Sequence, residues 1–185
     1  MQLYIWRHPK PKQVQGLCFG QSEVAVDRRK IKRLANQIDS YIKKHQLPKQ
    51  IYVSPLQRSK QVGLYLQQLG FDCQIDEWLM ETHFGDWEGK PWSKISKDEI
   101  DKWCDDFAQF APMGGESLTQ LFERVRAWLK TQKIEAAKPK APILAVGHAG
   151  WITTAKMVCA GKEVPSQAKD WPRPVGYCQL SVLEF

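Results

Sequence analysis

The stretch that decides the fold is Leu3-Tyr4-Ile5-Trp6-Arg7-His8, a short apolar run that ends in an Arg-His pair. Apolar and aromatic residues of this kind favour a β-strand over residues 3–6. A second run, residues 143–146, is the most apolar in the chain and is followed by Gly147-His148. Each predicted strand therefore ends at a histidine, at the edge of the sheet where α/β proteins bind ligands.

Amphipathic helices alternate with the short strands along the chain. Helices are predicted at residues 27–45, 57–69 and 150–159, and further strands at residues 51–53, 73–75 (an edge strand) and 179–183. This alternation predicts one α/β domain over residues 1–185, with a mostly parallel sheet and helices on both of its faces.

Two capping signals mark further helices. Ser96 with Glu99, and Ser117 with Gln120, have the Ser-x-x-Glu/Gln spacing of a capping box. The first helix is expected to bury a stripe, and the members of that stripe are Ile100, Trp103, Phe107 and Phe110. Residues 136–142, rich in Lys, Ala and Pro, are predicted to form a loop.

Composition narrows the class of protein. The chain has 185 residues, 43% of them hydrophobic, which suits one domain with a substantial core. Its five Cys are scattered without close pairs, which favours reduced thiols over disulfides or a zinc site. It has neither a signal-peptide pattern at its start nor an apolar run of the ~20 residues that would span a bilayer, so we expect a cytoplasmic protein without a membrane partner.

The net charge of +7 is concentrated in residues 28–49. A cluster of this kind has two interpretations, a nucleic-acid-binding surface or the solvated face of an amphipathic helix. Apolar residues at helical spacing favour the second, and they are Ile31, Leu34, Ala35, Ile38 and Ile42. No nucleic-acid partner is therefore expected, although the excess positive charge would attract an anionic substrate.

Four segments near strand ends carry side chains suited to phosphate chemistry: Arg7-His8, residues 54–59 with Arg58, residues 79–89 with Glu81, and residues 147–150 with His148. A neutral imidazole can attack phosphorus, guanidinium groups hold phosphate oxygens, and a partly buried carboxyl group can donate a proton. Each feature has an ordinary structural explanation when taken alone; Arg58, for example, would equally suit an ion pair with a nearby carboxylate.

The four segments together resemble the histidine phosphatase superfamily, with its phosphoglycerate-mutase-like fold. Arg7-His8 is similar to that family's Arg-His motif, and Ser54-Pro55-Leu56-x-Arg58 to its Ser-x-Leu-x-Arg motif. Glu81 with the following Phe84-Gly85-x-Trp87-Glu88-Gly89 resembles its acid motif, and Gly147-His148 its second histidine. The order and spacing agree over nearly the whole chain.

The resemblance implies a role for each residue. His8 attacks phosphorus and forms a phosphohistidine, with its other ring nitrogen bonded to a backbone carbonyl. Glu81 protonates the leaving oxygen and then activates water, and His148, in protonated form, stabilises the equatorial oxygens. Arg7, Arg58, His148 and the helix start at Ala149 bind phosphate, and neither a cofactor nor a metal is needed. A metal pair of His83 and Glu81 has too few ligands to be favoured.

Further segments resemble the α-ribazole phosphatase branch, which acts late in cobalamin synthesis; these are residues 16–20, 87–92 and 112–117. The resemblance implies α-ribazole 5′-phosphate as substrate. Candidates for the pocket wall are Cys18, Phe19, Gly20 and Trp87, although a buried or incidental thiol is favoured for Cys18 and packing in the core is open for Trp87. A helical cap is expected over about residues 90–116. One departure is Pro9, where most members have Gly, because proline has no N–H to offer a ligand.

Two alternatives remain open at this point. One is another enzyme of the same chemistry, a broad-specificity phosphatase of small molecules or a mutase of the phosphoglycerate type. The other, of a different class, is a non-catalytic module that binds phosphoryl ligands or nucleic acid. The sequence does not define the oligomeric state.

Overall fold

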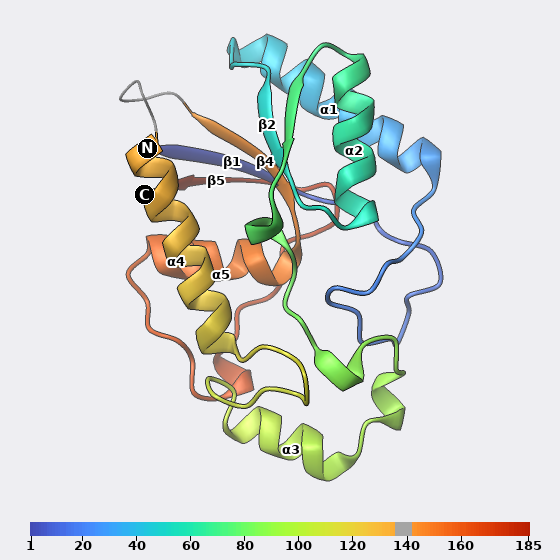
Figure 1. The fold of residues 1–185 in the computed structure, drawn as a ribbon, viewed down its shortest axis with the longest axis vertical. Helices are drawn as coiled ribbons and strands as arrows, with labels where there is room; N and C mark the ends of the chain where they lie inside the picture. Colours follow the sequence, from blue (N-terminus) through green and yellow to red (C-terminus); the bar gives the residue numbers. More distant parts are fainter. Residues whose placement is uncertain (136–141) are drawn as a thin grey trace.

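The computed structural model describes residues 1–135 and 142–185, which fold around one five-stranded sheet (Figure 1). The strands lie side by side in the order β3 (Asp72–Ile75), β2 (Gln50–Val53), β4 (Ile143–Gly147), β1 (Gln2–Arg7) and β5 (Leu180–Glu184). The first four are parallel, and β5 runs antiparallel to β1. The predicted mostly parallel sheet is confirmed, with β3 at its edge as expected.

Helices cover both faces of the sheet (Figure 1). On one face lie α1 (Arg28–His45) and α2 (Gln57–Gln68), and on the other α4 (Leu118–Glu135) and α5 (Ala149–Cys159). A fifth helix, α3 (Lys97–Asp105), lies beyond α4 and away from the sheet (Figure 1).

Strand β4 shows why the sheet needs helices on both sides. All five of its residues are buried. Leu144 and Val146 pack toward α1 and α2, whereas Ile143 and Ala145 pack toward α4 and α5. A central parallel strand buried on both faces therefore appears in the sequence as a continuous apolar run.

The predicted helix boundaries have clear physical causes. Ser96 Oγ accepts from Glu99 N at 3.2 Å, and Ser117 Oγ accepts from Gln120 N at 3.2 Å, so both predicted caps are confirmed. Helix α2 ends one residue before Leu69, and Gly70 follows with a φ of +84°, a conformation that favours glycine.

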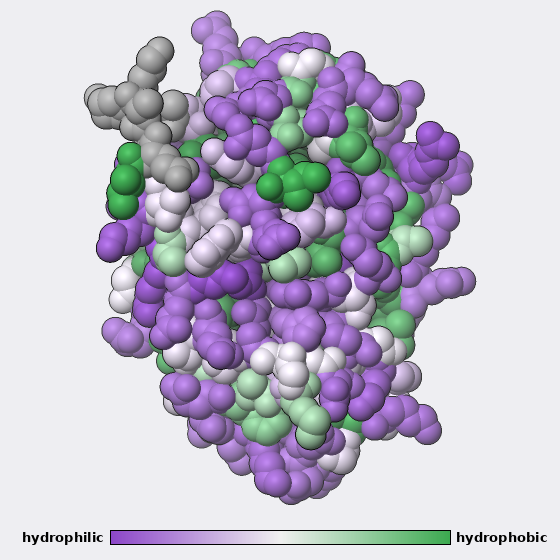
Figure 2. All heavy atoms as spheres, viewed as in Figure 1, coloured by the Kyte–Doolittle hydropathy of each residue, from purple (hydrophilic) through white to green (hydrophobic). Residues whose placement is uncertain are grey.

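The basic cluster lies on a solvated face. The apolar residues predicted for the inner side of α1 are all buried. The Lys and Arg residues from 28 to 44 are exposed. In the view of Figure 2 most of the surface is hydrophilic, and hydrophobic residues appear in small groups among polar ones.

Two predictions about the chain after residue 95 need comment. Helix α3 ends at Asp105, so Phe107 and Phe110 lie in the irregular segment that follows and not on a helical stripe. The Phe107 N–H donates to Ser166 O at 3.0 Å, a tertiary contact that helical spacing does not reveal. The loop predicted for residues 136–142 lies almost wholly outside the described residues.

None of the described helices has both the length and the apolar character needed to cross a membrane.

Candidate active site

The carboxyl ends of the parallel strands bring the candidate residues together. Arg7 is the last residue of β1, and it pairs in register with Gly147 at the end of β4. His8 and His148 follow these two residues directly, and their ring centroids lie 5.0 Å apart. Arg58 lies in the first turn of α2, just after β2. The structure therefore gathers segments that are far apart in the sequence at one edge of the sheet.

His8 has the geometry of a nucleophile. This residue is 2% exposed and lines a pocket at this edge of the sheet. Its Nδ1 lies 2.8 Å from Pro9 O, and because a carbonyl oxygen only accepts, Nδ1 must carry the hydrogen. Burial, followed by the charge of Arg58, lowers the pKa of His8 well below its usual value. The imidazole is therefore neutral, with a lone pair on Nε2, and the predicted backbone carbonyl contact is present.

Arg58 is held by neutral groups. Its side chain is 1% exposed. The guanidinium donates to His148 Nδ1 at 3.2 Å, to Ser22 O at 2.9 Å and to Gly20 O. A guanidinium has five N–H donors, so two remain for a ligand.

Arg7 is fixed from the other side of His8. Its guanidinium carbon lies 3.7 Å from the centroid of the Tyr177 ring, and Nη1 donates to Val175 O at 2.6 Å. Its Nε is buried and has no partner among the described residues. An unpaired buried donor of this kind is costly unless a ligand accepts from it.

The surroundings of the two guanidinium groups suit an anion. Burial is the main cause that lowers the pKa of both Arg7 and Arg58. In the part of the chain that the structure describes, neither forms an ion pair with a carboxylate. The alternative of an Arg58–carboxylate pair is therefore not what the structure shows. One buried and one partly buried positive charge without a counter-ion favour binding of an anion such as phosphate.

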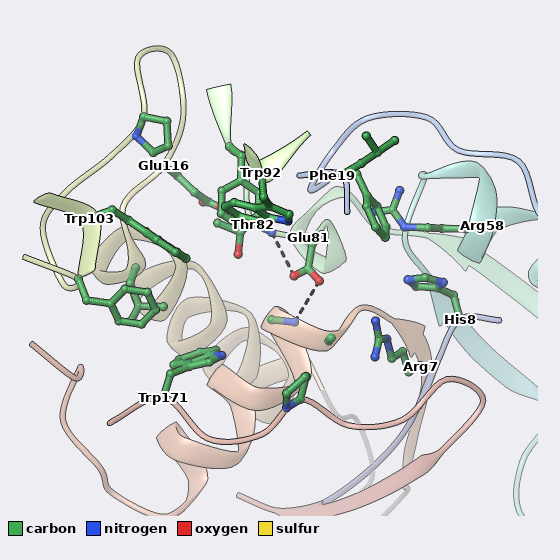
Figure 3. A pocket seen from close by; sticks show the side chains of 18 of the residues that line it. Arg7, His8, Phe19, Arg58, Glu81, Thr82, Trp92, Trp103, Glu116 and Trp171 are labelled. Carbon is green, nitrogen blue, oxygen red and sulfur yellow. Dashed lines mark hydrogen bonds between the residues drawn. The ribbon is translucent and has the colours of Figure 1, made fainter. Parts of the chain in front are cut away.

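Glu81 lies between the arginines and the far side of the pocket (Figure 3). Its Oε1 accepts from Thr82 N and Trp151 N, both at 3.1 Å, and its Oε2 accepts from Gly150 N at 3.0 Å. Helix α5 thus directs two of its first N–H groups at this carboxyl group. Since Oε2 accepts one hydrogen bond within the described part of the chain and Oε1 two, Oε2 is the oxygen with more room for a further hydrogen-bond partner.

His148 differs from the prediction. Its side chain is fully buried, and it is not among the residues that line the pocket. Its Nδ1 accepts from Arg58, and its Nε2 lies 2.8 Å from Ser54 Oγ. Burial, then Arg58, lowers the pKa of His148 well below its usual value, so the ring is neutral and not protonated as expected. In this structure His148 therefore holds the Arg58 guanidinium by a hydrogen bond and does not line the pocket.

The N–H groups at the start of α5 differ in their partners. Its Gly150 and Trp151 N–H groups are used by Glu81 and are not free for phosphate. Ala149 does line the pocket, and its N–H has no acceptor among the described residues. Of the helix N–H groups expected to bind phosphate, the one at Ala149 is available.

The pocket has a volume of about 440 Å³ and two unlike sides (Figure 3). We call Arg7, His8 and Arg58 its phosphate side. The opposite aromatic side consists of four side chains, which are Trp92, Trp103, Phe107 and Trp171. Trp92 and Trp103 stack with centroids 5.9 Å apart, and Phe107 bridges Trp103 and Trp171. The aromatic side is thus a connected wall of rings.

The predicted pocket wall is only partly right. Phe19 lines the pocket, with its ring 5.5 Å from the Arg58 guanidinium carbon. Cys18 and Trp87 are buried together in a separate apolar cluster with Ile95. Gly20 meets Arg58 through its carbonyl oxygen but does not line the pocket. Neighbouring residues along an extended segment point to opposite sides, and the sequence did not show which side faces the ligand.

Sequence reasoning missed Tyr177, which lines the pocket, stacks on Arg7 and lies 5.6 Å from His8 between ring centroids. A signal was present in the order of strands. Because β5 is antiparallel to β1, the residues just before β5 lie at the same edge as the end of β1. The direction of the last strand would have drawn attention to this tyrosine.

Among residues 1–135 and 142–185, no three His, Cys, Asp or Glu side chains are grouped so as to hold a metal ion.

The chain belongs to the histidine phosphatase superfamily (branch 1), whose family model matches residues 3–185. One relative, the glucosyl-3-phosphoglycerate phosphatase of Mycobacterium tuberculosis, is 33% identical over 135 residues, which is 68% of this chain and 58% of that protein. The chain thus matches somewhat over half the length of this relative.

Solved structures share the fold over nearly the whole chain. Mycobacterial glucosyl-3-phosphoglycerate phosphatase in complex with VO3 has a TM-score of 0.80 at 25% identity, and the match covers 99% of this chain and 92% of that one. The α-ribazole phosphatase of Shigella flexneri has a TM-score of 0.79 at 23% identity, with 100% and 90% covered. The latter likeness is one of fold.

Proposed function

We propose that the protein is a phosphomonoesterase that hydrolyses a small phosphate ester through a phosphohistidine on His8. One observation carries this proposal: a neutral imidazole lies between the buried guanidinium of Arg58 and the partly buried one of Arg7, and neither has a carboxylate partner in the described residues. Such a site binds a phosphate and presents a lone pair to its phosphorus. Family membership supports the same chemistry.

In the first step, Arg7, Arg58 and the Ala149 N–H hold the phosphate oxygens. His8 Nε2 attacks phosphorus, an N–P bond forms, and the bond from phosphorus to the ester oxygen breaks. The leaving oxygen takes a proton from Glu81 Oε2. The hydrogen bond between His8 Nδ1 and Pro9 O keeps the attacking nitrogen unprotonated.

In the second step, the N–P bond breaks. The ionised Glu81 takes a proton from a water molecule as this water attacks phosphorus, and inorganic phosphate leaves. Glu81 and His8 return to their starting states, so the protons balance over the cycle. Negative charge on the equatorial oxygens is stabilised in both steps by the two guanidinium groups.

For the substrate we propose α-ribazole 5′-phosphate, whose leaving group carries an aromatic benzimidazole. The aromatic side of the pocket supports this proposal, since flat rings pack well against Trp and Phe. Beyond the phosphate side, the charged residues that line the pocket in the described chain are Glu81 and Glu116. An uncharged leaving group suits these surroundings better than a carboxylate does.

A second candidate is a glucosylated phosphoglycerate, favoured by the 33% identity to the mycobacterial phosphatase. Such a substrate carries a carboxylate, for which the aromatic side offers no cation in the described residues.

We also propose that residues 90–116 act as a cap, because Trp92, Trp103 and Phe107 of the aromatic side come from this segment. We further propose that the protein resides in the cytoplasm and has no nucleic-acid partner.

A substrate panel tests the proposal. Phosphate release is measured from α-ribazole 5′-phosphate, glucosyl-3-phosphoglycerate, 3-phosphoglycerate and p-nitrophenyl phosphate. We expect kcat/KM for the first to exceed that of both carboxylated esters by at least about tenfold, since burying an unpaired carboxylate costs more than about 1.4 kcal/mol. Preference for a carboxylated ester would overturn the substrate proposal. Phosphoryl transfer to a second hydroxyl would indicate a mutase, and binding without turnover a non-catalytic module.

A further inference from the structure

A carboxylate that does not line the pocket gathers the backbone of one loop. Glu88 accepts hydrogen bonds from three consecutive N–H groups, those of Gly20 at 3.0 Å, Gln21 at 2.8 Å and Ser22 at 3.0 Å. It also accepts from Ser22 Oγ and from Phe84 N, the latter at 3.0 Å. Residues 20–22 are therefore fixed to a single side chain.

The same loop holds Arg58 through its carbonyl groups. Gly20 O and Ser22 O both accept from the Arg58 guanidinium. The N–H groups of residues 20–22 thus bond to an anion, while two of their carbonyl oxygens bond to a cation. The Gly20 carbonyl and the Gln21 N–H belong to one peptide group, so the bond to the carboxylate polarises this group and strengthens its carbonyl oxygen as an acceptor for the guanidinium.

The loop has little freedom to move away. A Cβ built on Gly20 would lie 1.8 Å from Thr82 O and 2.7 Å from Glu88 Oε1, so only glycine fits there. The side chain of Gln21 donates to Glu81 O at 2.9 Å, which ties the loop to the segment that carries Glu81. A change at Glu88 is therefore expected to alter the position of the Arg58 guanidinium.

Glu88 is ionised in this setting. Burial alone would raise its pKa, but the hydrogen bonds from Ser22, Phe84, Gln21 and Gly20 outweigh burial and lower the pKa below its usual value. A charged acceptor forms stronger hydrogen bonds than a neutral one.

We infer that Glu88 is a positioning residue for phosphate binding: it fixes the loop of residues 20–22, whose carbonyl groups aim the Arg58 guanidinium at the ligand. His148 supports the same guanidinium at its Nε. The inference rests on the proposed phosphate-binding role of Arg58. It adds a residue that touches neither the substrate nor the reacting atoms.

The test uses Glu88→Gln, which keeps the shape of the side chain but turns an amide NH2 toward backbone N–H groups. We expect the inhibition constant of inorganic phosphate to rise about tenfold, as for loss of a hydrogen bond to a charged group, and kcat/KM to fall at least as much. The milder Ser22→Ala, which removes only the hydroxyl bond to Glu88, is expected to raise this constant about threefold. Thermal unfolding of each variant shows that it is folded at the assay temperature.

The matched control is Glu99→Gln. Glu99 also accepts from two side chains, Trp87 Nε1 and Ser96 Oγ, but does not contact the loop. We expect this variant to leave the inhibition constant of phosphate unchanged. An equal effect of Glu88→Gln and Glu99→Gln would overturn the inference.

A double-mutant cycle with Arg58→Lys separates positioning from general destabilisation. Lysine cannot reach both carbonyl groups with a planar fork, so Glu88→Gln is expected to add less than about a twofold effect in that background. Effects that multiply would overturn the inference. If Arg58→Lys alone leaves phosphate inhibition unchanged, the proposed function of the site fails instead, which is a distinguishable result.

Discussion

The two sides of the pocket are built in different ways. On the phosphate side, Arg7, His8 and Arg58 sit at or just after strand ends, and backbone carbonyl groups hold each of them. On the aromatic side, Trp103 comes from α3 and the other rings from a short helical turn and irregular segments, and the rings hold one another by ring contacts. In the proposed function, the sheet supplies a fixed phosphate site, and the connecting segments select the leaving group.

The largest effect is expected from the phosphate side. His8→Ala removes the proposed nucleophile, and kcat on p-nitrophenyl phosphate should fall by about 10³-fold or more, since the covalent route is lost. The arginines remain, so the inhibition constant of phosphate should change far less than kcat. His45→Ala, at an exposed histidine of α1, is the control. Unchanged turnover in His8→Ala would contradict the proposed role of this residue.

The second-largest effect on turnover is expected at Glu81, which lies between the phosphate side and the aromatic side of the pocket. Glu81→Gln should lower steady-state kcat by about 10²- to 10⁴-fold, the usual contribution of a general acid and base. With p-nitrophenyl phosphate the leaving group needs no proton, so a stoichiometric burst of nitrophenolate should precede a slow hydrolysis step. Stopped-flow absorbance measures the burst. A lag, or no loss of rate, would show that another group moves the proton.

Burial of the two histidines makes a prediction for stability. The pKa of His8 and His148 is lowered well below the usual value of 6.5, mainly by burial. Below that pH the unfolded chain binds more protons than the folded protein. The free energy of unfolding should therefore fall as the pH falls from 6.5 toward the lowered pKa values, at about 1.4 kcal/mol per pH unit for each imidazole.

Urea unfolding between about pH 7 and pH 5 measures this slope. Carboxylates also titrate toward the acid end of the range, so the variant His8→Asn provides the comparison. The free energy of unfolding of this variant should fall less steeply as the pH falls. The difference in slope is the contribution of one imidazole, about 1.4 kcal/mol per pH unit. Equal slopes for the protein and the variant would mean that His8 is not held neutral.

A smaller effect is expected on the aromatic side. Trp171→Ala should raise KM for 1-naphthyl phosphate about tenfold, because a ring contact and apolar area are lost. The inhibition constant of inorganic phosphate should stay within about twofold, since the phosphate side is intact. Trp78→Ala is the matched control, because Trp78 is 50% exposed and does not line the pocket. An equal loss for both ligands would mean that the two sides are not separable.

The smallest effect is expected at Tyr177. Tyr177→Ala should raise the inhibition constant of phosphate about fivefold, as for loss of a partly desolvated cation–π contact with Arg7. Tyr177→Phe keeps the ring and should behave like the unchanged protein. A large effect of Tyr177→Phe would instead assign a role to the hydroxyl group.

The same comparison explains what the sequence could predict. Strand β4 and the caps at Ser96 and Ser117 have local signals, so the sheet and most helix boundaries were predictable. Because Arg7, His8 and Arg58 are adjacent to strand ends, their convergence followed from the parallel order. The irregular segments lack a regular spacing of apolar residues from which the direction of a side chain could be predicted. Trp171 could not be placed from pattern, and the sequence left open whether Cys18 and Trp87 face the core or the pocket.

His148 shows a second limit of sequence reasoning. Its position at the end of β4 was predictable, but the direction of its ring depends on Arg58 and Ser54, which meet it only in the folded chain. Its protonation state depends in turn on that burial.

The central claim is that His8 accepts the phosphoryl group. A radiolabelled phosphate ester is mixed with the protein, and in parallel with Glu81→Gln, and each reaction is quenched in alkali, in which phosphohistidine survives. Peptide mapping then locates the label. We expect an acid-labile label on the peptide that contains His8, transient in the unchanged protein and accumulating in the variant. Turnover without label on His8, or label on another residue, would contradict it.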